Sequence, residues 1–426
     1  MDHKQIRSAL ERARAGTEEL LAPVSDERLS AQVSPVQSPL VWDFAWIARF
    51  EELWLLEHAC GEPPVLERHD DVRDAFRHER DGGVAVPVLP PEAVRAYATD
   101  VREHVLEALE RLDLDTPSAL LRQRYVFGLV LQHELQRQET LLQTLELGGD
   151  GEYRLPRPHD PDRAPGGSDE ISIPDGSFVL GAVDEPWAYD NELASHEVQV
   201  RAFRIDRAPV TNGAYAEFIR DGGYGARGLW SAAGWAWRSR RGAAAPLSWE
   251  RDDDGWTRTR FGRREPVPPD EPVQHVSFHE ADTFARWAGK RLPTEAEWER
   301  AASWHEQKGK LRYPWGREWV GFEANLDRLR FSPAPAGSYS GGVSPVGCVQ
   351  MAGDVWEWTS SPFMPYPGFL AFPYPELSEI YFGREYRVLR GGSWATDGLV
   401  ARTTFRCREL PGRRLPFSGF RCARDA

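Results

Sequence analysis

The sequence predicts an α+β protein in which a four-helix bundle is followed by a domain of short strands, turns and aromatic clusters. Three observations predict this organisation. Long stretches of the first 150 residues space their apolar residues as helices do, residues 151–168 are dense in glycine, proline and aspartate, and most of the 17 tryptophans lie beyond residue 180. We therefore expect a helical domain over 1–150, a linker over 151–168 and a second domain over 169–426.

Four helices are expected in the first domain, and they cover residues 5–21, 40–59, 91–112 and 116–147. Residues 61–91 are polar and rich in proline, which predicts a long loop between the second and third helices. The second domain shows few helical signals, at residues 212–221, 279–288 and 294–305. The last of these begins with Thr294 and Glu297, a capping box whose side chains satisfy the first free amides of a helix.

Composition limits the classes of function. The 426 residues are 41% hydrophobic and 28% charged, as in globular proteins, and the formal charge of −14 disfavours nucleic acid and anionic membranes as partners. No apolar run approaches the length that spans a bilayer. The four cysteines have no CxxC spacing, which fits a reducing cytoplasm better than a disulfide framework. We expect a cytoplasmic protein with a small-molecule partner, and its oligomeric state stays open.

The stretch from Phe127 to Leu145 has the pattern of a metal-binding helix that lacks one ligand. His133 and Arg137 are four residues apart and share a helix face. A histidine at position 137 would present two imidazoles to one divalent ion. Arginine stays charged and does not ligate metals. The spacing therefore predicts a metal site that has been altered.

Several motifs in the second half resemble the formylglycine-generating-enzyme/sulfatase-modifying-factor domain, which has a C-type-lectin-like fold. They are the segments 209–213, 272–277, 287–299, 353–360 and 390–394. Joined to a DinB-like bundle, the chain resembles the EgtB-like family of non-haem iron sulfoxide synthases of ergothioneine biosynthesis. The motifs that carry this second resemblance are SPLVWD at 38–43, FEELW at 50–54, PYPGF at 365–369 and GFR at 419–421.

The resemblance implies an oxygen-using, iron(II)-dependent oxidoreductase that joins a thiol to hercynine as a sulfoxide. In that family three histidines hold the iron. The corresponding positions here are Trp46, His133 and Arg137, so His133 alone keeps its family identity. The resemblance therefore predicts a diverged member of the family with altered chemistry or an altered substrate, in which iron(II) is the implied cofactor or no metal binds.

Other family positions are also changed. The segment whose asparagine and tryptophan contact hercynine is occupied here by Cys407 and Arg408, followed by Glu409. The family's active-site tyrosine position is Leu377, which leaves Tyr366 and Tyr374 as candidate proton donors. For the carboxylates of the thiol substrate, Arg80 keeps one arginine and Gly83 replaces the other. Gln136, beside Arg137 on the metal helix, completes the substrate-binding candidates.

His133 has three open interpretations. It is an ordinary hydrogen-bonded histidine of the bundle, or it ligates a metal together with carboxylates such as Asp43 and Glu139. In the third, Arg137 stacks on Trp46 and plugs the former metal cavity, an interaction worth ~0.5–2 kcal/mol. Asp43 or Glu139 would then neutralise the guanidinium.

Three functional hypotheses follow. The first is a diverged oxidoreductase, and the second is a non-catalytic homologue that binds a small molecule or a partner protein in a cleft between the domains. The third is a copper- or thiol-dependent oxidase that uses Cys407 and Cys422, because formylglycine-generating enzymes hold copper with a cysteine pair. Both cysteines fall on expected C-terminal strands, outside any metal-binding spacing.

Overall fold

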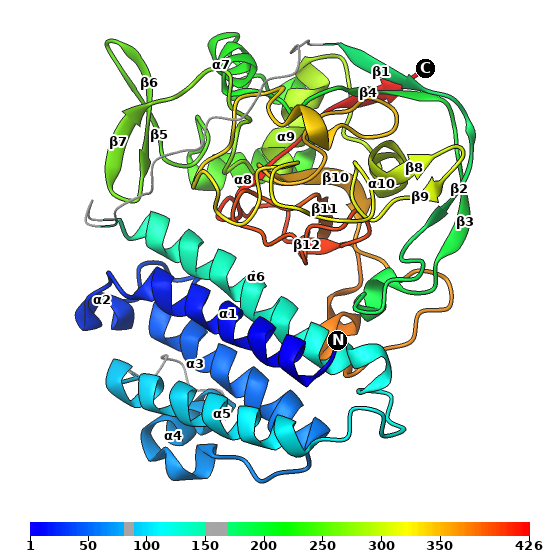
Figure 1. Ribbon diagram of the computed structural model, residues 1–426. Coiled ribbons are helices and arrows are strands. Elements are labelled where there is room, and N and C mark those ends of the chain that lie inside the picture. Colours follow the sequence, from blue (N-terminus) through cyan, green and yellow to red (C-terminus); the bar gives the residue numbers. More distant parts are fainter. Residues whose placement is uncertain (81–88, 150–152, 154–168) are drawn as a thin grey trace. The chain divides into compact units, whose positions relative to one another are not determined.

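The computed structural model describes residues 1–80, 89–149, 153 and 169–426, with only the backbone for 77–80. The chain divides into two compact units. The first unit comprises Met1–Arg154 together with Arg260–Arg263, and the second comprises Leu155–Thr259 together with Arg264–Ala426. The first is helical and the second mixes helices and strands, so the predicted α+β class is confirmed (Figure 1). Most of the predicted linker, 151–168, lies outside the described residues.

The helical unit consists of helices that lie side by side (Figure 1). Its helices are α1 (His3–Leu21), α2 (Asp26–Ser30), α3 (Leu40–Glu51), α4 (Asp70–Arg80), α5 (Pro91–Arg111) and α6 (Tyr125–Leu147). A π-helical stretch, Glu52–Ala59, continues α3, and single 3₁₀ turns cover Leu66–Arg68 and Arg122–Arg124. Helix α3 contacts α5 and α6, and α1 also contacts both, which gives the expected four-helix bundle.

Two helix predictions in this unit are wrong. The expected loop over 61–91 contains α4, because Val72, Ala75 and Phe76 form an apolar stripe at helical spacing within a highly charged segment. The last helix begins at Tyr125 rather than at residue 116. Gln123 and Arg124 have φ of 51° and 64°, and this left-handed backbone interrupts a helix.

The core of the bundle contains a balanced cluster of four buried charges. Arg14 donates from Nε to Glu134 at 2.9 Å and from Nη2 to Glu51 at 2.8 Å. Arg102 donates from Nε to Glu51 at 2.7 Å and from Nη2 to Glu134 at 3.4 Å. Buried carboxylates are tolerated when they are paired and hydrogen-bonded in this way. The cluster thus connects α1, α3, α5 and α6.

The second unit combines short helices with small sheets. Its helices are α7 (Asn212–Arg220), α8 (Ala232–Arg241), α9 (Phe278–Trp287) and α10 (Glu295–Ser303). Its strands are β1 (Glu170–Ile173), β2 (Gly176–Leu180), β3 (His196–Val200), β4 (Phe203–Asp206), β5 (Trp249–Asp252), β6 (Gly255–Arg260), β7 (Arg263–Pro266), β8 (Trp304–His305), β9 (Gly309–Lys310), β10 (Trp356–Pro362), β11 (Arg387–Arg390), β12 (Cys407–Glu409), β13 (Ser418–Gly419) and β14 (Ala423–Asp425). Helix α8 was missed, whereas the capping box of Thr294 and Glu297 is present at the start of α10.

The sheets join segments that are far apart in the sequence. Strand β10 pairs antiparallel with β11 and parallel with β13, and β12 extends this sheet in the order β12-β11-β10-β13. The C-terminal strand β14 pairs with β4, whose other neighbour is β1. The remaining sheets of the described residues are β2-β3, β5-β6-β7 and β8-β9.

Aromatic packing and buried ion pairs hold the second unit together. Trp298 is fully buried and donates from Nε1 to Glu357 at 2.7 Å. Around it, Phe178, Ile205 and Met351 belong to the same apolar core. Seven of the 14 tryptophans of this unit are buried and thus pack as scaffold residues. Within the described residues, no helix has the length and apolar character that crossing a membrane demands.

Candidate functional site

The altered metal motif lies on α6, where one guanidinium contacts both a histidine and an aspartate. Arg137 donates from Nε to Nε2 of His133 at 3.4 Å, as the four-residue spacing on a helix allows. Its Nη1 donates to Oδ1 of Asp43 on α3 at 3.0 Å. The three side chains thus form a single polar group between α3 and α6.

His133 is held as a neutral ring. Its imidazole stacks on Phe50, with ring centroids 3.8 Å apart and 15° between the planes. Burial, and secondarily the charge of Arg137, lowers the pKa of His133 well below its usual value. Because Nε2 accepts from Arg137, the proton of the neutral ring belongs on Nδ1. The lone pair that would ligate a metal at Nε2 is therefore occupied. No pattern in the sequence predicted the stack on Phe50.

Asp43 is the buried partner of this group. Burial raises the pKa of its carboxyl to about 6, although the neighbouring Arg137 acts in the opposite direction. Its side chain is 4% exposed, whereas that of Arg137 is 38% exposed. In the described part of the chain, no donor reaches Oδ2 of Asp43. One carboxylate oxygen of Asp43 is thus unused.

Trp46 does not stack on Arg137, so the predicted plug of these two side chains is wrong. The indole packs against Phe76 of α4, with centroids 4.9 Å apart and 61° between the planes. Among the described residues, the contacts of Arg137 are those with His133 and Asp43. The ion pair with Asp43 turns the guanidinium toward a buried charge, which is a stronger attraction than an indole face offers.

Other candidates near this helix have different surroundings. Glu134 faces the buried charge cluster and also accepts from Thr17 at 2.8 Å, so it is not directed at His133. Gln136 donates to the carbonyl of Gln132 at 2.9 Å. Arg80 ends α4, but its side chain lies outside the described residues, as does Gly83. Their predicted contacts with a thiol substrate stay predictions.

The tyrosine candidates belong to the second unit. Tyr366 is 7% exposed, and its hydroxyl donates to the buried Glu295 at 3.2 Å. The guanidinium of Arg406 lies 4.1 Å from the centroid of the Tyr366 ring. Burial raises the pKa of Tyr366 well above its usual value, so its proton is firmly held. Tyr374 is half-buried and precedes a 3₁₀ turn, Pro375–Leu377.

The three C-terminal substrate-binding candidates share strand β12. Cys407, Arg408 and Glu409 are half-buried and pair with Leu389, Val388 and Arg387 of β11. The guanidinium of Arg408 lies 3.7 Å from the centroid of the Tyr381 ring. Burial raises the pKa of Glu409. The strand thus presents a thiol, a cation and a carboxyl group in succession.

The cysteine pair of the oxidase hypothesis is divided between two sheets. Cys407 lies in β12, whereas Cys422 directly precedes β14. The carbonyl of Cys422 accepts from the backbone amide of Asp206 in β4, and its own amide donates to the Asp206 carboxylate. Burial raises the pKa of the Cys422 thiol well above its usual value, which disfavours the thiolate that binds copper. All four cysteines are described, and none is in a disulfide.

The side chains around His133 do not fit a three-histidine iron site. They offer one imidazole whose Nε2 is hydrogen-bonded, one carboxylate paired with a guanidinium, and an indole that does not ligate metals. Across the described ranges, no group of three histidine, cysteine, aspartate or glutamate side chains is arranged to hold a metal ion.

Comparison with known families matches both units. Residues 9–141 match the DinB superfamily, and residues 157–426 match the sulfatase-modifying factor enzyme 1-like domain. A helical unit of the first kind followed by a unit of the second kind defines the class of this protein.

Individual relatives narrow the class to one family. The chain is 45% identical to a hercynine oxygenase of Mycobacterium tuberculosis over 429 residues, which cover 99% of each protein. It is 44% identical to a hercynine oxygenase of Mycolicibacterium smegmatis over 95% of each. A formylglycine-generating enzyme of Streptomyces coelicolor is 35% identical over 60% of this chain and 89% of its own length. The chain belongs to the EgtB-like family, as its motifs predicted.

Proposed function

We propose that this protein is a diverged EgtB-like protein that binds a small molecule and does not carry out the iron-dependent oxygenation of hercynine for which its relatives are named. The observation that supports this most directly is the position of Arg137. Its guanidinium pairs with Asp43 and donates to His133, the histidine that keeps its family identity.

A guanidinium at this position opposes iron for two reasons. It occupies the lone pair of the imidazole at Nε2, and it keeps its charge at any physiological pH. Two unit charges ~4 Å apart repel by about 4 kcal/mol at an effective dielectric constant of ~20, and a divalent ion doubles that repulsion. Iron binding would therefore require the guanidinium to leave.

Changes in the second unit support the same proposal. By resemblance to the family, Leu377 stands at the position of the active-site tyrosine, and Cys407 and Arg408 stand at the positions that contact hercynine. A leucine has no hydroxyl to donate, and a cysteine lacks both the amide donor and the amide acceptor of an asparagine. The proposed ligand thus differs from hercynine, and the half-buried groups of β12 are its candidate contacts.

Iron content tests the proposal. The purified full-length protein is incubated anaerobically with iron(II), desalted and analysed for iron per chain, and then assayed by mass spectrometry for sulfoxide formed from hercynine, γ-glutamylcysteine or cysteine, and oxygen. We expect less than ~0.1 iron per chain and no sulfoxide, since one available imidazole does not hold iron(II) in a protein site. The Trp46→His, Arg137→His double variant is expected to approach one iron per chain.

A matched double variant separates the effect of removing the guanidinium from the effect of adding imidazole ligands. Trp46→Phe with Arg137→Gln removes the cation but adds no ligand, so we expect it to stay at the wild-type iron content. Stoichiometric iron in the wild-type protein, together with sulfoxide formation, would contradict the proposal.

A second candidate function is an oxidoreductase with an altered metal site. Oδ2 of Asp43, which is buried and which no donor in the described structure reaches, favours it. The 38% exposure of Arg137 gives the guanidinium room to turn outward, which would leave a carboxylate and an imidazole on facing helices. In that case the wild-type protein binds iron. Asp43→Asn would then abolish that binding, whereas the exposed Asp115→Asn would not.

A further inference from the structure

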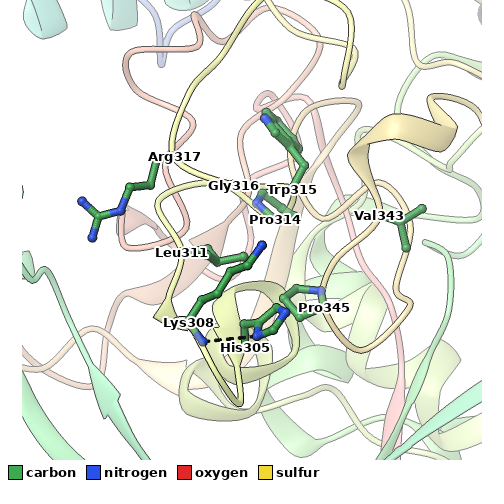
Figure 2. Close-up of a pocket in the computed structure, with 9 residues that line it drawn as sticks. All are labelled: His305, Lys308, Leu311, Pro314, Trp315, Gly316, Arg317, Val343 and Pro345. Atoms are coloured by element: carbon green, nitrogen blue, oxygen red, sulfur yellow. Dashed lines mark hydrogen bonds between the residues drawn. The ribbon is translucent and has the colours of Figure 1, made fainter.

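A cavity of about 470 Å³ lies in the second unit, lined by the β8–β9 hairpin and by loops near residues 314–317 and 343–345 (Figure 2). Its volume is in the range of small-molecule binding sites. None of the candidate site residues discussed above lines it. Its lining combines an aromatic surface with cationic side chains.

The aromatic surface is fixed in place. Trp315 stacks on Tyr313, with centroids 5.2 Å apart and 4° between the ring planes, and its Nε1 donates to the carbonyl of Glu318 at 2.9 Å. The hydroxyl of Tyr313 donates to the carbonyl of Gly398 at 2.8 Å, which anchors the stack. Leu311 and Val343 add aliphatic surface to the lining. A flat apolar ligand could therefore pack against Trp315 without the entropic cost of ordering that side chain.

His305 contributes a hydrogen-bond donor. Its Nδ1 accepts from the backbone amides of Gln307 and Lys308, at 3.2 and 3.3 Å. Because both amides are donors, Nδ1 carries the lone pair and the proton of the neutral ring is on Nε2. Within the described structure, Nε2 has no hydrogen-bond partner. An N–H group is therefore available at the edge of the cavity.

Lys308 contributes an uncompensated positive charge. The chain has four lysines, and the other two of this unit are paired: Lys290 with Asp206 at 2.5 Å, and Lys310 with Glu299. No ion pair of the Lys308 ammonium is found among the described residues, and no carboxylate side chain lines the cavity. A cation with no carboxylate in the cavity lining attracts an anion, although the formal charge of the whole chain is −14.

Figure 2 shows how the cations lie. The side chain of Lys308 extends past Leu311 toward Gly316 and Trp315, whereas that of Arg317 points away from the other labelled residues. Lys308 and the Nε2–H of His305 are thus the groups that could donate hydrogen bonds to an anion in the cavity.

We propose that this cavity binds a small organic anion that carries a carboxylate or phosphate group on a flat ring. The ring lies against Trp315, and the anionic oxygens accept from the ammonium of Lys308 and from His305. Both kinds of anion accept charge-assisted hydrogen bonds, so the cavity chemistry is the same for each.

Phenyl phosphate, benzoate and the neutral benzamide are suitable probes of the full-length protein. Titration calorimetry and saturation-transfer NMR measure their binding, and the stronger of the two anions identifies the anionic group. We expect at least one anion to bind more tightly than benzamide. Lys308→Ala should raise the Kd of that anion about three- to fivefold, which is the size of an exposed charge pair. The exposed Lys4→Ala, in α1, is the matched control and should leave the Kd unchanged.

A second variant distinguishes a specific loss of anion binding from a loss of the folded structure. Val343→Asp places a negative charge in the lining at a half-buried position, and we expect it to weaken the anion more than benzamide while the thermal unfolding curve stays similar. Equal binding of benzamide and the anions, absence of anion binding, or an unchanged Kd in both Lys308→Ala and Val343→Asp would overturn the proposal.

Discussion

Arg421 binds Glu357 through two of its nitrogen atoms, with Nε and Nη2 each 2.7 Å from a carboxylate oxygen, and neither side chain is appreciably exposed. Glu357 lies in β10, and Arg421 also donates to the backbone carbonyls of Val349 and Gln350 at 3.0 and 3.1 Å. This pair therefore joins the central sheet to the C-terminal segment.

Removal of one partner of this pair should strongly destabilise the folded protein. We expect Arg421→Met to lower the free energy of unfolding by about 3–5 kcal/mol, because Glu357 would remain buried without its cation. Urea denaturation followed by tryptophan fluorescence measures the change. The exposed pair of Arg291 with Asp425 provides the control, and Asp425→Asn should change stability by less than ~1 kcal/mol. Similar effects of both variants would show that burial does not decide the outcome.

The buried Asp354 should make the protein less stable as the pH rises from 4 to 7. Burial raises the pKa of its carboxyl to about 6, against the opposing hydrogen bonds from the Ala334 amide, Asn325 and Gln350. An unfolded aspartate titrates near ~3.9, so between these two values the folded chain holds a proton that the unfolded chain has lost. Stability falls across this window by about 3 kcal/mol and is then constant above the folded pKa.

Asp354→Asn isolates this contribution, since asparagine does not titrate. We expect the free energy of unfolding of the variant, measured in urea at pH 4.5 and at pH 7, to fall less than that of the wild-type protein. The same decline in both proteins would mean that Asp354 does not hold its proton in the folded state.

Glu134 is predicted to be structural although it directly follows the candidate ligand His133. It accepts from Arg14, Thr17 and Arg102 in the core of the bundle. Glu134→Gln leaves two guanidinium groups with one carboxylate, and we expect a loss of about 3–5 kcal/mol in unfolding free energy, measured by circular dichroism in urea. The exposed Glu110→Gln serves as the control. Unchanged stability in Glu134→Gln would rule out this role.

Phe76 should stabilise the helix that the sequence did not predict. Its ring contacts Trp42 and Trp46 edge-on, with centroids 5.6 and 4.9 Å apart, and it is 3% exposed. Phe76→Ala is expected to cost about 3 kcal/mol and to speed amide hydrogen exchange in α4. In Asp74→Ala, on the exposed side of the same helix, exchange should change little. Equal exchange in the two variants would argue against packing of α4 through Phe76.

Local sequence patterns predicted much of the fold. The apolar spacing over residues 5–21 and 91–112 predicted α1 and α5 to within a few residues, and Thr294 with Glu297 marked the start of α10. Helix α4 was missed because its three buried apolar residues are few beside the charges around them. The buried cluster of Arg14, Arg102, Glu51 and Glu134 was missed because charged residues are expected at the surface.

By itself, the sequence determined the family, the α+β class and the presence of an indole and a guanidinium where the family has imidazoles, since these depend on residue identity and local spacing. Only the tertiary structure decided which groups these side chains meet. Arg137 bonds to Asp43 across two helices, and Trp46 packs on Phe76. The physical reason is that a partner far away in the sequence is selected by burial and charge neutralisation, and neither can be read from spacing along the chain.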